Sequence, residues 1–201
     1  MTAFTPSTIA ALVIAASFAA GLNVYATVLT LGILAHGHWV VLPAGLEVLG
    51  DWWVIAASAA MFALEFVADK IPGVDMVWNA LHTFIRVPIA GLIAYRATSH
   101  LSPEMQLLAT AGGALIALVA HSTKTAVRAV VTPSPEPASN IALSTGEDGI
   151  AIGLTWLVTR HPWTAAGIAA ALTLFAVLMA RWIVKALRKL WQRRPAPAAV
   201  L

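Results

Sequence analysis

Apolar residues follow one another along most of the chain in long continuous runs, which short polar turns separate. Strands of a spanning barrel would instead alternate between apolar and polar positions over about ten residues. Runs of this length are typical of helices that cross a membrane. The pattern therefore predicts an all-α, polytopic transmembrane bundle of about six helices. After a first apolar stretch over about residues 7–35, helices are predicted over about 51–68, 75–98, 104–131 and 139–159, and from 163 into a basic C-terminal end.

The first apolar stretch is longer than one straight crossing requires. About 20 apolar residues cross a hydrocarbon core of about 30 Å, and the sequence Gly21-Leu22-Asn23 interrupts this stretch near its centre. We therefore expect a kink or a break between two half-helices at that point. The following residues, 36–50, are rich in turn-forming residues and are predicted to form a loop at the membrane interface, with tryptophans near the boundary.

Two proline-containing turns give the chain a weak internal repeat of two similar hairpins. Pro72-Gly73 ends the helix over 51–68, and the segment 132–137, with three prolines, ends the helix over 104–131. In each hairpin the first helix ends in charged residues, and the second helix opens with polar residues at helical spacing. Because the charges are exchanged between the hairpins, we expect ion pairs to form across them. The first hairpin carries Glu65 and Arg86, and the second carries Arg128 and Glu147.

Composition supports a membrane protein and limits its chemistry. Of the 201 residues, 60% are hydrophobic and 10% are charged, whereas roughly 25% are charged in a typical soluble domain. The absence of cysteine excludes disulfides, thiolate metal sites and a cysteine nucleophile. We expect one transmembrane domain over residues 1–194, a disordered tail over 195–201, and a first helix that is retained, because no basic region precedes it.

The distribution of basic residues predicts the orientation of the chain. The net charge of +3 comes largely from a C-terminal cluster, so we read it as a topology signal and expect no nucleic-acid partner. Since cytoplasmic ends of spanning helices collect Lys and Arg, this cluster is predicted to be cytoplasmic, and six crossings would place the N-terminus there too. The cluster consists of Arg181, Lys185, Arg188, Lys189, Arg193 and Arg194.

Polar residues inside the predicted helices fall at helical spacing. A charge at the centre of a spanning helix costs roughly 2.5–3.5 kcal/mol on insertion scales, so such positions are informative. Spacings of three and four place each set on one face of its helix. The sets are Asp75, Asn79, His82 and Arg86; His121, Lys124 and Arg128; Asn140, Ser144 and Glu147 with Asp148 beside them; and Ser58, Glu65 and Asp69.

These polar faces would place charge deep in the membrane. Arg86 lies eleven residues after Asp75, which is about 16 Å along a helix and close to the midplane. An acidic partner is therefore expected for Arg86. The faces hold five carboxylates and three fixed cations, an excess of two negative charges that would favour a bound cation, or protons shared among the carboxylates and His82.

Several motifs resemble a known family. They are Glu65-Phe-Val-Ala-Asp69-Lys70-Ile-Pro72-Gly-Val-Asp75, His82-Thr83-Phe84-Ile-Arg86, Ser134-Pro-Glu-Pro137-Ala-Ser-Asn140, Glu147-Asp148 and Gly21-Leu22-Asn23-Val-Tyr25. The last is similar to an N-terminal Gly-Leu-Arg-x-Tyr pattern, with Asn in place of Arg. Together they resemble the bacterial membrane family called domain of unknown function 4126. The resemblance implies a multi-pass protein of the bacterial cytoplasmic (inner) membrane, but it transfers no activity.

Three functional hypotheses follow from the polar faces. The first is a small transporter or channel, with a polar cavity open to the cytoplasm that handles a small cation or protons. The second is an accessory or structural subunit whose salt bridges fix helix packing, in a homo-oligomer or a membrane complex. The third is a lipid-handling enzyme or flippase, against which the sequence shows no catalytic constellation, so we expect no enzyme, cofactor or metal. The candidate residues are Glu65, Asp69, Asp75, Asn79, His82, Arg86, His121, Lys124, Arg128, Asn140, Ser144, Glu147 and Asp148.

Overall fold

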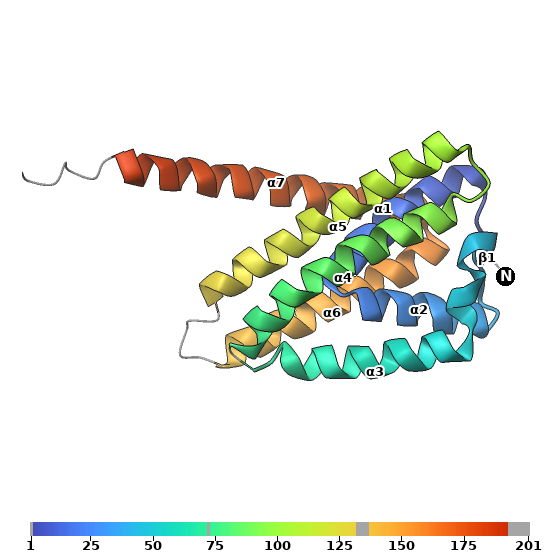
Figure 1. Cartoon of the computed structure of the whole chain (residues 1–201), viewed down its shortest axis with the longest axis horizontal. Helices are drawn as coiled ribbons and strands as arrows, with labels where there is room; N and C mark the ends of the chain where they lie inside the picture. Colours follow the sequence, from blue (N-terminus) through green and yellow to red (C-terminus); the bar gives the residue numbers. More distant parts are fainter. Residues whose placement is uncertain (1, 72, 132–136, 193–201) are drawn as a thin grey trace, which may run out of the picture.

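The computed structural model describes residues 2–71, 73–131 and 137–192. Within these residues the chain is a helical bundle with one pair of two-residue strands (Figure 1). The elements are β1 (Thr2–Ala3), α1 (Pro6–Leu22), α2 (Val24–His36), β2 (Val40–Val41), the short 3-10 helix η1 (Ala44–Gly50), α3 (Trp52–Ala68), α4 (Val74–Ala97), α5 (Pro103–Val131), α6 (Pro137–Arg160) and α7 (Pro162–Gln192).

The predicted all-α bundle is confirmed, and the helices from α3 onward begin and end close to the predicted residues. The predicted connector over 132–137 lies outside the described residues except for Pro137, which opens α6, and so do Pro72, Arg193, Arg194 and the predicted tail over 195–201. Three described helices, α4, α5 and α7, are long and apolar enough to cross a membrane, and η1 with α3, bent by 66°, would make a fourth. The count of six spans stays a prediction.

The expected break in the first apolar stretch is confirmed at Asn23. This residue is extended, with φ −150°, and it ends α1 and begins α2. Its backbone N–H donates to the Ala19 carbonyl, and its side-chain oxygen accepts from the Ala26 N–H at 2.9 Å. Because one asparagine caps both helix ends, each half-helix has a satisfied terminus in the bundle interior.

Helices α1 and α2 form a V whose tip lies inside the bundle. At the outer ends β1 pairs in parallel with β2, so the start of α1 lies beside the end of α2. The tip residue Asn23 is fully buried. In Figure 1 the open end of the V lies near the N-terminus, on the right, whereas α7 ends on the left. The N-terminus and the end of α7 therefore lie at opposite ends of the bundle.

Gly21 allows α1 to pack closely against α5 near this tip. A Cβ atom at Gly21 would lie 2.5 Å from the Ala117 carbonyl oxygen and 2.8 Å from the Ala117 Cα. Both atoms belong to the backbone of a long helix, so they cannot move aside cheaply. The glycine is therefore required by the close contact between the two helices.

We predict that Gly21→Val lowers the free energy of unfolding by about 1–3 kcal/mol, because overpacking must push α1 away from α5. The measurement is reversible unfolding of purified protein in mixed detergent micelles. Gly112→Val is the matched control, since a Cβ at Gly112 of α5 meets no heavy atom of the described structure within 4 Å. Equal unfolding free energies for the two variants would contradict the prediction.

Candidate functional site

The polar faces of α3, α4, α5 and α6 converge in the interior of the bundle. All thirteen candidate residues are buried, and the most exposed of them, Glu147, is 7% exposed. We use the term charged cluster for the eight Asp, Glu, Lys and Arg residues among them: Glu65, Asp69, Asp75, Arg86, Lys124, Arg128, Glu147 and Asp148. Helical periodicity thus predicted correctly which residues face inward, although it could not predict how they pair.

Lys124, on α5, lies at the centre of the charged cluster. Its Nζ is 2.8 Å from Asp69 Oδ2, 3.3 Å from Glu147 Oε2 and 3.7 Å from Glu65 Oε1. The same amine donates to the Leu22 carbonyl at 3.1 Å, at the C-terminal end of α1. A helix C-terminus carries partial negative charge, so this carbonyl is a suitable partner for a buried ammonium. Lys124 therefore connects α1, α3, α5 and α6 through one charge.

Arg128 lies one helical turn further along α5 and contacts three carboxylates. Its Nη2 contacts Glu147 Oε2 at 2.5 Å and Asp69 Oδ2 at 3.0 Å, and its Nη1 lies 3.6 Å from Asp75 Oδ2. Nη1 also donates to the Asp69 backbone carbonyl at 2.9 Å, which Asn140 Nδ2 contacts at 3.2 Å. The end of α3 is thus held between α5 and α6 by a guanidinium with its donors directed at fixed acceptors.

Arg86 occupies the other end of the charged cluster. Its Nη2 donates to Glu65 Oε1 at 2.6 Å, and its Nη1 donates to Asn79 Oδ1 at 3.0 Å and to His121 Nδ1 at 2.9 Å. A guanidinium can only donate, so His121 Nδ1 must accept and His121 must be neutral. Its Nε2–H then donates to Thr83 Oγ1, 2.7 Å away. The expected acidic partner of Arg86 is therefore Glu65.

The expected exchange of ion pairs between the hairpins is wrong for these four residues. Glu65 pairs with Arg86 inside the first hairpin, and Arg128 pairs with Glu147 inside the second. The two hairpins are joined instead by Lys124 and Arg128, which both contact Asp69. Sequence spacing shows which residues share one face of a helix. It does not show how each helix is rotated relative to its neighbours, and that rotation decides which charged residues meet.

Asp148 differs from the other carboxylates of the charged cluster. It makes no ion pair with any described residue, and its Oδ1 accepts one hydrogen bond, from Asn23 Nδ2 at 2.8 Å. Its second oxygen, Oδ2, is buried and accepts no hydrogen bond from the described residues, as is also true of Glu65 Oε2 and Asp69 Oδ1. Buried charges normally find full compensation. The carboxylates therefore have acceptor capacity beyond what the described chain supplies.

His82 and Ser144 lie beside the ion pairs and form hydrogen bonds with residues outside them. His82 Nδ1 donates to the Trp78 carbonyl at 2.7 Å, so its Nε2 accepts from the Tyr25 hydroxyl at 3.1 Å. Ser144 accepts from Lys70 Nζ at 3.4 Å, and the same amine lies 3.0 Å from the centroid of the Phe66 ring. Burial lowers the pKa of the Lys70 amine.

The sequence did not single out the contribution of the α1–α2 tip. Asn23 and the Leu22 carbonyl contact Asp148 and Lys124 across more than a hundred residues of sequence. The interruption at Gly21-Leu22-Asn23 was the available signal, because a break in an apolar helix leaves backbone groups that need partners. Tyr25 and Thr83, which bond to the two histidines, belong to the family motifs but to none of the polar faces that the sequence predicted.

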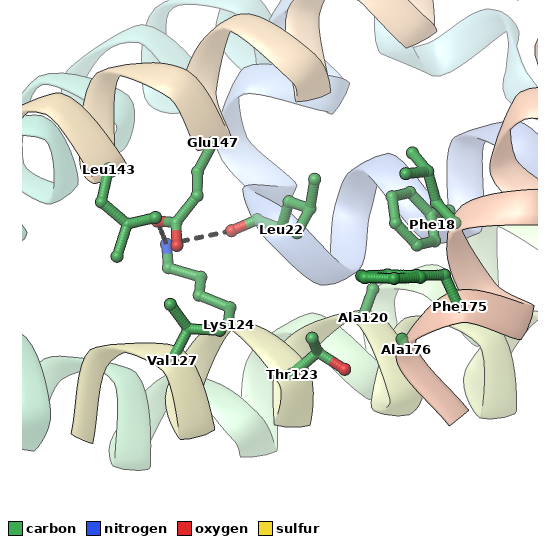
Figure 2. A pocket seen from close by; sticks show the side chains of 11 residues that line it. Phe18, Leu22, Ala120, Thr123, Lys124, Val127, Leu143, Glu147, Phe175 and Ala176 are labelled. Carbon is green, nitrogen blue, oxygen red and sulfur yellow. Dashed lines mark hydrogen bonds and ion pairs between the residues drawn. The ribbon is translucent and has the colours of Figure 1, made fainter. Parts of the chain in front are cut away.

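The candidate side chains close onto one another through ion pairs, and the open polar cavity stays a prediction. Opposite charges in a low-dielectric interior pair closely, because each desolvated charge is costly alone. A separate pocket of about 160 Å³ reaches the edge of the charged cluster between α1, α5, α6 and α7, with Lys124 and Glu147 at one end (Figure 2). Among the described residues, no three His, Asp or Glu side chains are arranged to hold a metal ion.

Comparison with known proteins gives one match. A family model described as "Domain of unknown function (DUF4126)" matches residues 10–182, the same family that the sequence motifs resemble. The matched range includes every residue of the charged cluster, all of α2 and α1 from Ala10 onward. No curated protein and no solved structure matches the chain.

Proposed function

The chain belongs to the DUF4126 family, and from this premise we propose that it is a proton-coupled membrane transporter of a small cation, seen here with its charged cluster closed. A transporter rather than an enzyme fits a polar centre that is buried among apolar helices. Ionisable residues at membrane depth are characteristic of proton relays and ion pathways. The cluster has five carboxylates for three fixed cations, so a proton or a bound cation is needed to balance it.

The observation that carries the proposal is the state of Asp148. This carboxylate is 4% exposed, it makes no ion pair with a described residue, and its Oδ2 has no described hydrogen-bond partner. A buried carboxylate without a charged partner favours its neutral, protonated form. Closer approach of Lys124 would favour the charged form, whereas loss of the hydrogen bond from Asn23 Nδ2 would favour the neutral form. Asp148 can therefore take up and release a proton when its surroundings change.

The α1–α2 tip supports the proposal because it connects the proton carrier to a helix break. Broken helices in transporters place half-helix ends at ion sites near the membrane midplane. Here Leu22 O and Asn23 Nδ2 lie at such a break and contact Lys124 and Asp148. Movement of either arm of the V would change the surroundings of both residues.

We predict that Asp148→Asn reduces proton flux at least tenfold in proteoliposomes that carry an internal pH-sensitive dye and an imposed gradient of protons or of a small cation. Asparagine keeps the size of the side chain and its contact with Asn23, but it cannot carry a proton. The variant should therefore unfold like the parent protein. Flux and unfolding are measured on the same preparation.

The matched control is Asp51→Asn, which removes an exposed carboxylate at the start of α3. This variant should keep the parental flux. If Asp148→Asn and Asp51→Asn transport protons equally, or if the parent protein shows no flux above empty liposomes, the proposal fails.

One observation favours a second candidate function, that of a structural subunit. Each of the three fixed cations of the charged cluster is paired with at least one carboxylate, as expected of a network that fixes helix packing. In that case the partner is another membrane protein or a second copy of the chain. Exchange of Glu65 and Arg86 in one double variant would then preserve folding and copurification with the partner, and Asp148→Asn would have no effect.

We also propose the cytoplasmic membrane of a bacterium as the location, with the basic end of α7 in the cytoplasm. The basic residues Arg181 and Lys185 support this orientation. The prediction of a cytoplasmic N-terminus assumed six full crossings. The V formed by α1 and α2 returns to its starting side, which supports an N-terminus on the opposite side from the end of α7.

A further inference from the structure

The pocket beside the charged cluster combines an apolar body with a charged end. Figure 2 shows Lys124 and Glu147 at one end, and Phe18 and Phe175 at the other, with Leu22 between them. Its volume is about 160 Å³, and a dry apolar cavity of about 150 Å³ is known to hold benzene. The pocket therefore has room for a group about the size of a phenyl ring, and the exposed edge at Phe175, which is 62% exposed, lets a longer ligand extend outward.

The charges at the inner end indicate the sign of the ligand. The Lys124 amine donates to Leu22 O and to Asp69 Oδ2 and lies 3.3 Å from Glu147 Oε2, so this cation is already compensated. Glu147 makes its contacts with Lys124 and Arg128 through Oε2, and it is the carboxylate that lines the pocket. The five carboxylates of the charged cluster still outnumber the fixed cations when Lys70 is added to the three cations of the cluster.

We propose that this pocket binds an organic cation with an aromatic or branched hydrocarbon body. The ammonium group lies beside Glu147, and the body lies along Leu22 and contacts the rings of Phe18 and Phe175. The inference rests on the proposed function and names its substrate class. Apolar walls with a few polar or charged groups at fixed places are the usual composition of a small-molecule site, where those groups fix the orientation of the ligand.

The test uses phenethyltrimethylammonium as the probe and equilibrium dialysis against full-length protein in nanodiscs, with empty nanodiscs as the blank. Its neutral carbon isostere, (3,3-dimethylbutyl)benzene, and the anion 3-phenylpropanoate should bind at least tenfold more weakly. Phe175→Leu should weaken binding of the cation about threefold to tenfold, because it removes an aromatic contact. Phe84→Leu, on the exposed face of α4, is the matched control and should bind as the parent does.

Glu147→Gln should weaken binding of the cation at least tenfold, but this variant also loses the pair with Arg128 and can unfold. Phe175 makes no such pair, so Phe175→Leu tests the site independently. Equal binding of the neutral isostere, tighter binding of the anion, or equal effects of Phe175→Leu and Phe84→Leu would overturn the inference. Absence of cation binding in a protein whose proton flux still depends on Asp148 would overturn the inference and leave the proposed function standing.

Discussion

Replacement of Lys124 by methionine should lower the free energy of unfolding by about 3–5 kcal/mol, because it leaves buried carboxylates without their central cation. Asp69, Glu65 and Glu147 all lie within 3.7 Å of the Lys124 amine, and methionine has a similar length but no charge. The variant should therefore keep the approximate shape of the side chain and lose its charge together with its hydrogen bonds to Asp69 and the Leu22 carbonyl. The measurement is reversible unfolding in mixed detergent micelles.

The double variant Lys124→Met/Asp69→Asn tests this explanation. It removes the carboxylate nearest to the amine together with the amine, so part of the lost stability should return. Lys185→Met, on the exposed surface of α7, is the matched control and should change stability by less than about 0.5 kcal/mol. If Lys124→Met behaves like this control, the ion pairs around Lys124 do not hold the bundle together.

Replacement of Arg86 by methionine should have an effect of similar size, again about 3–5 kcal/mol. Arg86 is the charged partner of Glu65 and also donates to Asn79 and His121. Its loss leaves Glu65 with only the more distant Lys124 at 3.7 Å. Thermal unfolding in detergent micelles measures the loss, and the double variant Arg86→Met/Glu65→Gln should recover part of it.

Arg96→Met provides the comparison for this prediction within the same helix. Arg96 lies in the last turn of α4 and is exposed, so its replacement should leave the unfolding temperature almost unchanged. A loss in Arg86→Met that persists undiminished in the double variant would mean that Asn79 and His121, and not Glu65, are the partners through which Arg86 stabilises the fold.

Much of the fold could be predicted from the sequence, because apolar runs and proline turns are local signals. The bounds of α3, α4, α5 and α6 follow from them to within two residues, and the spacing of polar positions identified all thirteen buried candidates. These inferences need only the helical period and the cost of exposing a charge to hydrocarbon.

The pairing inside the charged cluster could not be predicted in the same way. Glu65 could pair by charge with either Arg86 or Arg128, and the choice between them depends on the rotation and packing of the helices. The role of Asn23 was hidden for a related reason. A polar residue at a helix break indicates that backbone groups there need partners. It does not indicate which residue it contacts, and Asn23 contacts Asp148, 125 positions later in the sequence.

The V of α1 and α2 also sets the order in which the chain can be assembled. Its arms, roughly 25 Å and 20 Å long, are each shorter than a hydrocarbon core of about 30 Å. The buried partners of its tip, Lys124 and Asp148, are synthesised more than a hundred residues later. The V therefore cannot complete the buried contacts of its tip until α5 and α6 have been synthesised.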